Sequence, residues 1–292
     1  WYTTPIFSMK SFLIVLLLLS LWPALLVSAD AGVSQRIQSL SLRIEENPDS
    51  QALHLQRSLA YMEDGQSELA LSDILKAESL DGLVAASYVH GVLLYRQQRY
   101  VDARPYLDRS LKSYPKHRGA RNYRARLLRD IGEDRQALAD YEVLIALNDD
   151  LDPGYYVVTA RLMAGQPERG VEAALTLLDR RMAQLGMIST LQRYAIELER
   201  QRGNYNAAIT RLANLDAKLR ATPQWQLEVA ELLLEAGRPQ EALPYLFVAQ
   251  EQLQIAPPTG VNLASLEEVN QLLASAPRPV DQVMSESSKG GR

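Results

Sequence analysis

The 292-residue sequence contains no cysteine. Disulfide bonds, thiolate nucleophiles, cysteine-ligated zinc, iron–sulfur clusters and a lipidated N-terminal cysteine are therefore excluded, so packing must hold the fold together. A basic excess is also lacking, because 31 Lys and Arg residues face 35 Asp and Glu residues. General nucleic-acid binders usually carry a strong positive charge, and nothing here indicates one. With 47% hydrophobic and 23% charged residues, the chain is nevertheless apolar enough to fold.

Catalytic and metal-binding motifs are lacking too. The sequence has no G-x-S-x-G, phosphate-loop, G-x-G-x-x-G or H-E-x-x-H motif. Its three histidines, His54, His90 and His117, do not share a helix at metal-ligand spacing. His90 falls at a core position, and we expect His54 and His117 near helix starts or turns. The sequence therefore predicts no catalytic residue, no metal site and no cofactor.

Two segments match functional motifs only in part. Residues 148–154, Asn-Asp-Asp-Leu-Asp-Pro-Gly, begin like an acidic calcium loop, but Arg161 stands where the twelfth-position glutamate is needed. A turn with helix-capping carboxylates accounts for this segment. Ser113 and Lys116 have the S-x-x-K spacing of serine acylases, but Pro115 breaks the helix that this chemistry requires.

The N-terminal segment has the three parts of a secretory signal. Lys10 supplies a basic head, Phe12 to Leu21 an apolar middle, and Val27 to Ala29 a small-residue end. Cleavage at this end predicts a mature chain that is periplasmic or secreted. About 18 apolar residues can also just span a bilayer, so an uncleaved membrane anchor facing the periplasm is the alternative. Met9 directly precedes the basic head, and we expect translation to start there, with residues 1–8 as upstream sequence.

A period near 34 residues runs through the rest of the chain. Residues that could end a helix are spaced by 33, 34, 33, 38 and 34 positions, a period typical of arrays of paired antiparallel helices. A small residue follows most of these turns by five positions, and a small side chain lets two helices cross closely. A larger apolar residue follows four positions later and lies on the same helix face. The turn residues are Gly65, Gln98, Gly132, Gly165, Gly203 and Gly237; the small residues are Ala70, Ala103, Ala137, Gly170, Ala208 and Ala242; the larger residues are Ile74, Leu107, Tyr141, Ala174, Leu212 and Leu246.

Two segments carry a family resemblance. Residues 60–65, Ala-Tyr-Met-Glu-Asp-Gly, and residues 203–208, Gly-Asn-Tyr-Asn-Ala-Ala, resemble the tetratricopeptide repeat (TPR) pattern of Tyr, Gly, Tyr and Ala at set intervals. The resemblance covers residues 51–256 as about six units and is that of an exported bacterial TPR-containing protein. It implies an all-α fold, a right-handed superhelical solenoid of helix-turn-helix units with flanking N- and C-terminal helices.

The array sets the expected organisation of the chain. A helix over Ser34 to Glu46 should precede the array, and another over Leu263 to Ala274 should cap it. The 38-residue spacing adds about one helical turn around Leu175 to Thr190, where we expect a lengthened helix pair or a break between two subarrays. The expected segments are an upstream extension (1–8), a signal peptide (9–29), a leading helix (30–50), the array (51–256, irregular around 165–190), a capping helix (257–275) and a disordered tail (276–292).

The resemblance also assigns candidate binding residues. In TPR proteins the first helix of each unit lines the concave groove, and Tyr and Arg dominate binding energy at interfaces. The positions that carry lysine and asparagine in the carboxylate-clamp subset are Leu55, Leu59 and Val92 here, so that role is not assigned. The groove candidates are Tyr88, Val92, Tyr95, Arg96, Asn122, Arg126, Arg129, Tyr155, Thr159, Arg193 and Arg200.

The expected function is that of a non-catalytic protein–protein interaction scaffold or adaptor in the bacterial envelope. Its groove would hold a peptide, a partner protein or an anionic polymer. An acidic partner fits the positive charge, which is densest over Lys116, Arg118, Arg121, Arg124, Arg126 and Arg129. No nucleic-acid partner is expected. The alternatives are a membrane-anchored assembly factor of an envelope complex, retained by an uncleaved first helix, and a hydrolase with an unrecognised site.

Overall fold

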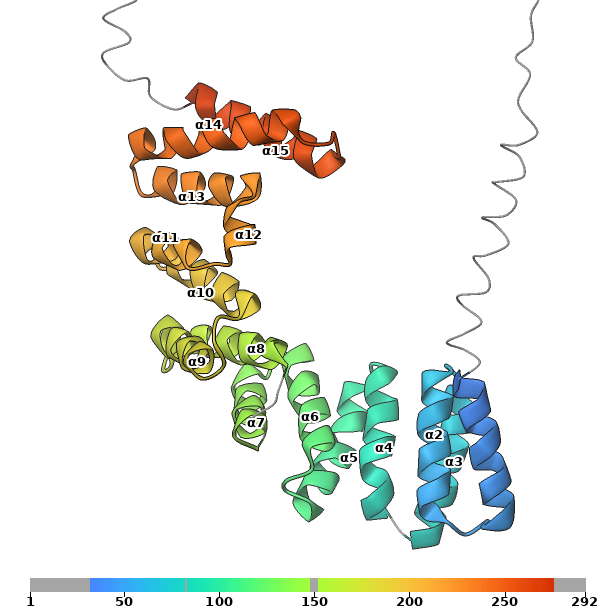
Figure 1. The fold of residues 1–292 in the computed structure, drawn as a ribbon. Coiled ribbons are helices and arrows are strands. Elements are labelled where there is room, and N and C mark those ends of the chain that lie inside the picture. Colours follow the sequence, from blue (N-terminus) through green and yellow to red (C-terminus); the bar gives the residue numbers. More distant parts are fainter. Residues whose placement is uncertain (1–31, 82, 148–151, 276–292) are drawn as a thin grey trace, which may run out of the picture. The chain divides into compact units, whose positions relative to one another are not determined.

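Helices make up the part of the chain that the structure describes. The computed structural model describes residues 32–81, 83–147 and 152–275, and these residues form helices and no strand (Figure 1). The predicted all-α repeat fold is confirmed. The helices are residues 32–46, α2 (Gln51–Glu63), α3 (Ser67–Asp81), α4 (Leu83–Arg96), α5 (Tyr100–Ser113), α6 (Arg118–Asp130), α7 (Asp134–Leu147), α8 (Pro153–Ala164), α9 (Gly170–Leu185), α10 (Ser189–Gln201), α11 (Tyr205–Ala213), α12 (Ala217–Arg220), α13 (Pro223–Glu235), α14 (Pro239–Ile255) and α15 (Gly260–Ser275).

The chain divides into two compact units, and the first ends at Leu147. The first unit contains α2 to α7 and the second contains α8 to α15. The division comes before α8, whereas the irregular spacing suggested a break around 165–190. The segments expected at 1–29 and 276–292 lie outside the described residues. Within the described residues, no helix combines the length and apolar character needed to cross a membrane.

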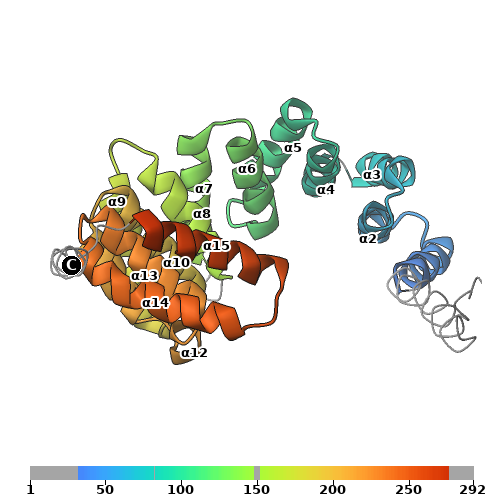
Figure 2. The ribbon, with the colours of Figure 1, turned by 90° about the horizontal axis from the view of Figure 1, so that it is seen from above.

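The first unit consists of three helix pairs, α2–α3, α4–α5 and α6–α7, whose members lie side by side (Figures 1 and 2). Residues 64–66, 97–99 and 131–133 join the helices of each pair. The middle residue of each turn has a left-handed backbone, with φ of 75° at Gly65, 59° at Gln98 and 80° at Gly132. Gln98 therefore fills a position that glycine adopts more easily.

The helices of a pair cross at a small residue. Ala70, Ala103 and Ala137 are each the fourth residue of a second helix and are fully buried. Ala208 and Ala242 take the same place in α11 and α14. A methyl group at this point lets the two backbones approach closely, as the sequence predicted.

The α8–α9 pair departs from the expected register. Gly165 follows α8 with φ of −77°, and residues 165–169 form a longer turn than in the other pairs. Gly170 is the first residue of α9, with φ of 69°. The buried small residue is Ala174, and fully buried Leu178 follows it by four residues. The prediction that Gly170 lies at the crossing and Ala174 one turn later is therefore wrong by four residues, because the longer turn delays the start of α9.

The flanking helices bury the two ends of the array. In the N-terminal helix, residues 32–46, Leu40 and Ile44 pack against Leu53 and Ala60 of α2. At the other end, the fully buried Val269 of α15 joins the core formed by α13 and α14. Each flanking helix thus covers an apolar helix face that would otherwise be left to solvent.

Candidate binding surface

The first helices of neighbouring pairs contact each other within each unit. In the first unit α2 contacts α4, and α4 contacts α6; in the second unit α8 contacts α10. Within a unit, a second helix also contacts the first helix that follows it, as α3 contacts α4, α5 contacts α6 and α9 contacts α10. Each unit therefore has a face made of first helices, on which side chains about one repeat apart in sequence meet.

An aromatic cluster lies on the first-helix face of the first unit. The ring centroid of Tyr123, on α6, lies 6.2 Å from that of Tyr88 and 5.4 Å from that of Tyr95, both on α4. Both contacts are edge-on, an arrangement that aromatic rings favour. The guanidinium carbon of Arg126 lies 5.4 Å from the ring centre of Tyr95 and 5.7 Å from that of Tyr123. We call Tyr88, Tyr95, Tyr123 and Arg126 the Tyr–Arg cluster.

The start of α6 holds Tyr88 in place. The His117 side chain caps α6 by accepting a hydrogen bond from the backbone N–H of Ala120 at 3.0 Å. Its ring contacts that of Tyr88 at a centroid distance of 4.5 Å, with the two planes tilted by 44°. A Cβ at Gly119 would lie 2.8 Å from the Tyr88 hydroxyl, so the absence of a side chain at Gly119 makes room for the ring. Burial raises the pKa of Tyr88.

Asp130 joins the cluster to the end of α6. The Tyr95 hydroxyl donates to Asp130 Oδ2 at 2.7 Å, and Arg129 Nη2 donates to Asp130 Oδ1 at 2.8 Å. Burial, together with the hydrogen bond to Asp130, raises the pKa of Tyr95 to about 12. Burial acts to raise the pKa of Asp130, but the hydrogen bonds from Tyr95 and Arg129 outweigh it and hold that pKa below its ordinary value.

Two guanidinium groups on this face form no ion pair with a described residue, although the charge of Arg126 helps to lower the pKa of nearby Asp130. Arg96 is exposed and donates to the backbone oxygen of Met62, at 3.0 Å. Arg126 is exposed and lies over the two tyrosine rings. Neither arginine forms an ion pair with any residue that the structure describes. The face therefore presents positive charge beside aromatic surface.

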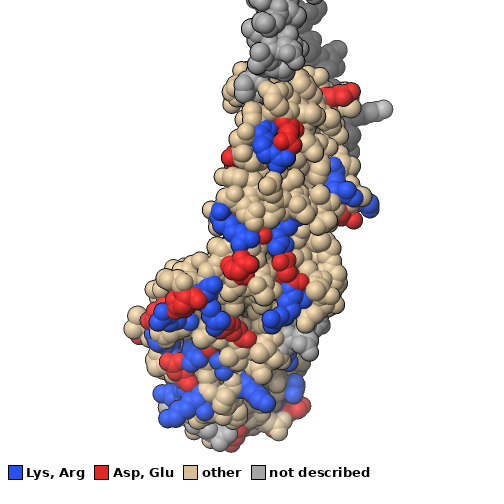
Figure 3. Space-filling view, turned by 90° about the vertical axis from the view of Figure 1, so that its left-hand side faces the viewer, with Lys and Arg blue, Asp and Glu red and all other residues tan. Residues whose placement is uncertain are grey.

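The first-helix face of the second unit carries ion pairs instead. Arg193 Nη1, on α10, lies 3.3 Å from Glu228 Oε2 on α13. Arg200 pairs with Glu235 and, at 3.6 Å, with Glu231. Figure 3 shows basic side chains lying next to acidic ones on the face that it draws. Arg193 and Arg200 thus pair with residues about one repeat further along the chain, whereas the guanidinium carbon of Arg161, on α8, lies 5.5 Å from the ring centre of Tyr194.

The structure brings together part of the predicted residue set. Tyr88, Tyr95, Arg126 and Arg129 share the face of the first unit with Arg96, and Asn122 is partly buried on α6. Tyr155, Arg193 and Arg200 belong to the second unit. Two candidates that were carried over from the family pattern, Val92 and Thr159, are wrong.

Val92 and Thr159 cannot contact a ligand because their side of the helix faces the core. Val92 is 2% exposed and packs with Val89 and Leu93. Thr159 is fully buried, and its hydroxyl donates to the backbone oxygen of Tyr155 at 2.7 Å.

The dense run of positive charge is divided between two sides of α6. Arg121 and Arg124 turn toward α7, where each donates to Asp140 at 2.7 Å. Arg124 also donates to Asp108 at 2.8 Å. The Asp140 side chain is only 4% exposed, so these arginines form a buried charge network that links helices rather than a binding surface.

The other histidines also have local roles. His54 Nδ1 lies 2.9 Å from Asp73 Oδ1, and Arg57 Nε donates to Asp73 Oδ2 at 2.7 Å. This arrangement resembles the Asp140 network and lies two repeats earlier in the chain. His90 is buried, as predicted, and its Nδ1 lies 2.8 Å from Glu78 Oε1. Among the described residues, no group of three His, Asp or Glu side chains is arranged to hold a metal ion.

Sequence reasoning missed Tyr123 and Asp130. Tyr123 precedes Arg126 by three residues, so it shares a helix face with a residue that was selected. Asp130 follows Tyr95 by 35 residues, about one repeat. Pairing each selected residue with the position one repeat later would have found Asp130.

Comparison with known families agrees with this architecture. A family model described as tetratricopeptide repeat matches residues 88–155. These residues therefore match the tetratricopeptide repeat family, and the repeat fold of the described residues agrees with that match. The matched residues include the Tyr–Arg cluster. TPR proteins are generally non-catalytic, and the TPR fold is that of a protein–protein interaction scaffold.

Solved TPR structures share the fold at low sequence identity. The C-terminal part of a TPR repeat-containing protein from Cytophaga hutchinsonii aligns with a TM-score of 0.63 at 13% identity, over 84% of this chain and 98% of that one. A TPR protein from Parabacteroides merdae aligns with a TM-score of 0.51 at 16% identity, over 80% and 99%. The structure of Naa15/Naa10 bound to HypK-THB aligns with a TM-score of 0.51 at 16% identity, and the alignment covers 84% of this chain and 37% of that one. No curated protein sequence matches this chain.

Proposed function

We propose that this protein is a non-catalytic scaffold that binds an acidic segment of a partner protein on the first-helix face of its first unit. Arg126 carries the proposal, because this exposed guanidinium lies over two tyrosine rings and has no ion-pair partner among the described residues. Tyr and Arg are the side chains most enriched among the residues that dominate interface energy. The Tyr–Arg cluster offers both types in one fixed arrangement.

A carboxylate is the group that suits this arrangement. The guanidinium carbon of Arg126 lies over both rings, and the N–H groups of a guanidinium project in its plane, where a ligand can accept from them. A carboxylate can accept two of these hydrogen bonds at once. Arg96 supplies a second positive charge on the neighbouring helix. One structural neighbour of the same fold, Naa15/Naa10, is itself bound to HypK-THB.

A fluorescent peptide of alternating glutamate and leucine residues tests the proposal by anisotropy. We expect the double change Arg126→Glu and Arg129→Glu to weaken binding by about tenfold or more, since the charge of Arg126 becomes repulsive and Glu at position 129 adds a second negative charge beside Asp130. Helical content and melting temperature should stay nearly unchanged. Binding by the unaltered protein should weaken as salt is raised, because exposed charges are screened over about 8 Å at physiological ionic strength.

The matched control is the double change Lys112→Glu and Arg180→Glu, which alters net charge equally at exposed positions outside the cluster. This control should bind the peptide as the unaltered protein does, and a peptide with glutamine in place of glutamate should bind weakly. Equal loss in both double variants would mean that attraction is due to net charge alone. Normal binding by the Arg126 and Arg129 variant would place the site elsewhere. Either result would overturn the proposal.

We also propose that the protein acts in the bacterial envelope, as a periplasmic or secreted chain. Support comes from the signal-peptide pattern of residues 9–29, which lie outside the described residues. Expression from Met9 in a Gram-negative host, followed by mass spectrometry, should give a chain that begins at Asp30. An uncleaved chain in the membrane fraction would favour the anchored alternative, and an uncleaved chain in the cytosol would contradict both.

A further inference from the structure

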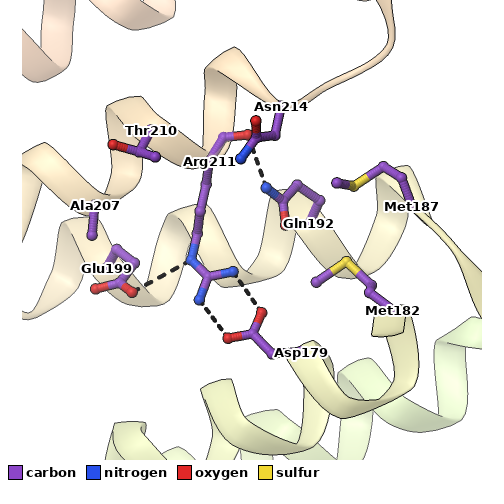
Figure 4. Close-up of a pocket in the computed structure, with 9 residues that line it drawn as sticks. All are labelled: Asp179, Met182, Met187, Gln192, Glu199, Ala207, Thr210, Arg211 and Asn214. Atoms are coloured by element: carbon purple, nitrogen blue, oxygen red, sulfur yellow. Dashed lines mark hydrogen bonds and ion pairs between the residues drawn. The ribbon is translucent and has the colours of Figure 1, made fainter. Parts of the chain in front are cut away.

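A pocket of about 530 Å³ lies within the second unit, between α9, α10 and α11 (Figure 4). Its floor contains Gln192 and Glu199, which are 2% and 3% exposed. Its rim contains the exposed side chains of Met187, Thr210 and Asn214. A volume of this size falls within the range of known ligand sites.

The pocket exists because α11 is short. It has 9 residues, whereas the preceding second helix, α9, has 16. The C-terminal part of α9 therefore lacks a neighbouring helix of matching length. Gly186, with φ of 85°, turns the chain away after α9. As a consequence, Leu185 and Met187 are 57% and 49% exposed.

The charged groups of the pocket are held in ion pairs, and Glu199 is also paired with Arg202 at 2.6 Å. Arg211 donates two hydrogen bonds to Asp179, at 2.7 and 2.8 Å, and one to Glu199 at 3.4 Å. Hydrogen bonding to Asp179 raises the pKa of Arg211 above its ordinary value. Since these charges are already paired, the pocket does not select a ligand by charge.

Gln192 provides the feature that points to a ligand. Its Nε2 donates to the backbone oxygen of Arg211 at 2.8 Å, which fixes the orientation of the amide because a carbonyl can only accept. Its Oε1 is buried and has no hydrogen-bond partner. A buried acceptor without a donor is destabilising, and a ligand that supplies a donor would remove this penalty. Met182 and Met187 lie beside Gln192 (Figure 4). Because Oε1 is closed off from solvent, a ligand donor reaches it only after these flexible side chains move aside.

We propose that this pocket binds a short peptide segment of a partner protein, with an apolar side chain against Met182 and Met187 and a peptide N–H donating to Gln192 Oε1. A peptide fits because it carries an apolar group and an N–H donor next to each other. Thr210 and Asn214 on the rim can hydrogen-bond to the rest of its backbone. The site is separate from the Tyr–Arg cluster and does not depend on the function proposed there.

Methionine methyl groups report binding directly. The sequence has 6 methionines, so a sample labelled with ¹³C at the methionine methyl groups gives a simple NMR spectrum. The probe is N-acetyl-leucine N-methylamide, and its control is the same compound methylated at both amide nitrogens, which lacks N–H donors. We expect the signals of Met182 and Met187 to shift, and those of buried Met62 and Met163 to stay in place. The donor probe should bind about fivefold more tightly or better, as expected for an otherwise unpaired acceptor.

Two variants place the binding in the pocket. Ala207→Phe should abolish the shifts by filling the pocket, whereas Ala213→Phe, at an exposed position of the same helix, should leave them unchanged. Gln192→Met keeps the side-chain volume but removes the acceptor, so both probes should then bind alike. If Gln192→Met does not fold, the two alanine variants and the comparison of the two probes still show whether the ligand binds in this pocket. Equal binding of both probes to the unaltered protein, or normal binding by Ala207→Phe, would overturn the proposal.

Discussion

Arg126 of the first unit and Arg200 of the second differ in the neighbours that they meet on their first-helix faces. Arg129 and Arg200 both stand three residues before the glycine of their turn. Arg126 stands six residues before the turn in the first unit, and the second unit has Glu231 at the matching place in α13. Arg200 therefore pairs with glutamates one repeat later, whereas Arg126 lies on tyrosine rings without an ion-pair partner in the described part of the chain.

This difference shows that the availability of an arginine depends on its neighbours across the repeat. Salt bridges at exposed positions contribute little stability, so the pairs of Arg193 and Arg200 mainly neutralise charge. Below the surface, Asp140 in the first unit and Glu199 in the second each pair with two arginines. A buried carboxylate and an exposed one should consequently respond differently when each is changed.

The largest effect is expected at the buried network of the first unit. Asp140→Ala leaves Arg121 and Arg124 without their shared partner and should lower the free energy of unfolding by about 3 kcal/mol or more. Urea denaturation followed by circular dichroism measures this. Asp134→Ala, in the first turn of the same helix, is the control and should cost less than about 1 kcal/mol. Similar losses in both variants would show that the network does not stabilise the unit.

A smaller effect is expected at Tyr95. Tyr95→Phe removes the hydrogen bond to Asp130 and should cost about 1 kcal/mol at neutral pH. The folded pKa of about 12 exceeds the ordinary value of about 10 for tyrosine, so this stabilisation is complete below pH 10 and is lost as pH rises toward 12. The difference between the two proteins should shrink over that interval. Tyr114→Phe, at an exposed residue, is the control and should leave the free energy of unfolding unchanged. If Tyr95→Phe lowered that free energy by the same amount at every pH, the hydrogen bond to Asp130 would not be the cause.

The smallest effect is expected in the second unit. Glu235→Gln removes one exposed partner of Arg200 and should change the free energy of unfolding by less than about 0.5 kcal/mol. The small change should disappear at high salt, because exposed charges are screened. A loss as large as that of Asp140→Ala would mean that the exposed ion pairs of the second unit also hold its helices together, and the contrast between buried and exposed carboxylates would fail.

Several features of the fold could be predicted from single residues. The left-handed turns at Gly65, Gly132, Gly203 and Gly237 and the buried small residue after each turn follow from local backbone and side-chain size. The register of α9 could not be predicted, because the longer turn at 165–169 has no distinct residue pattern. The burial of Val92 and Thr159 could not be predicted either, because a small rotation of a helix decides which of its sides meets the core.

The sequence by itself determined that the chain folds as paired helices with a period near 34 residues, because turn geometry and helix crossing depend on residues close together in the chain. It also identified four of the residues that meet on the first-unit face, Tyr88, Tyr95, Arg126 and Arg129. Only the tertiary structure decided which arginines are paired and that Gln192 Oε1 lacks a donor. Those properties depend on which side chains from different repeats meet across helices, and the packing of the helices determines those contacts.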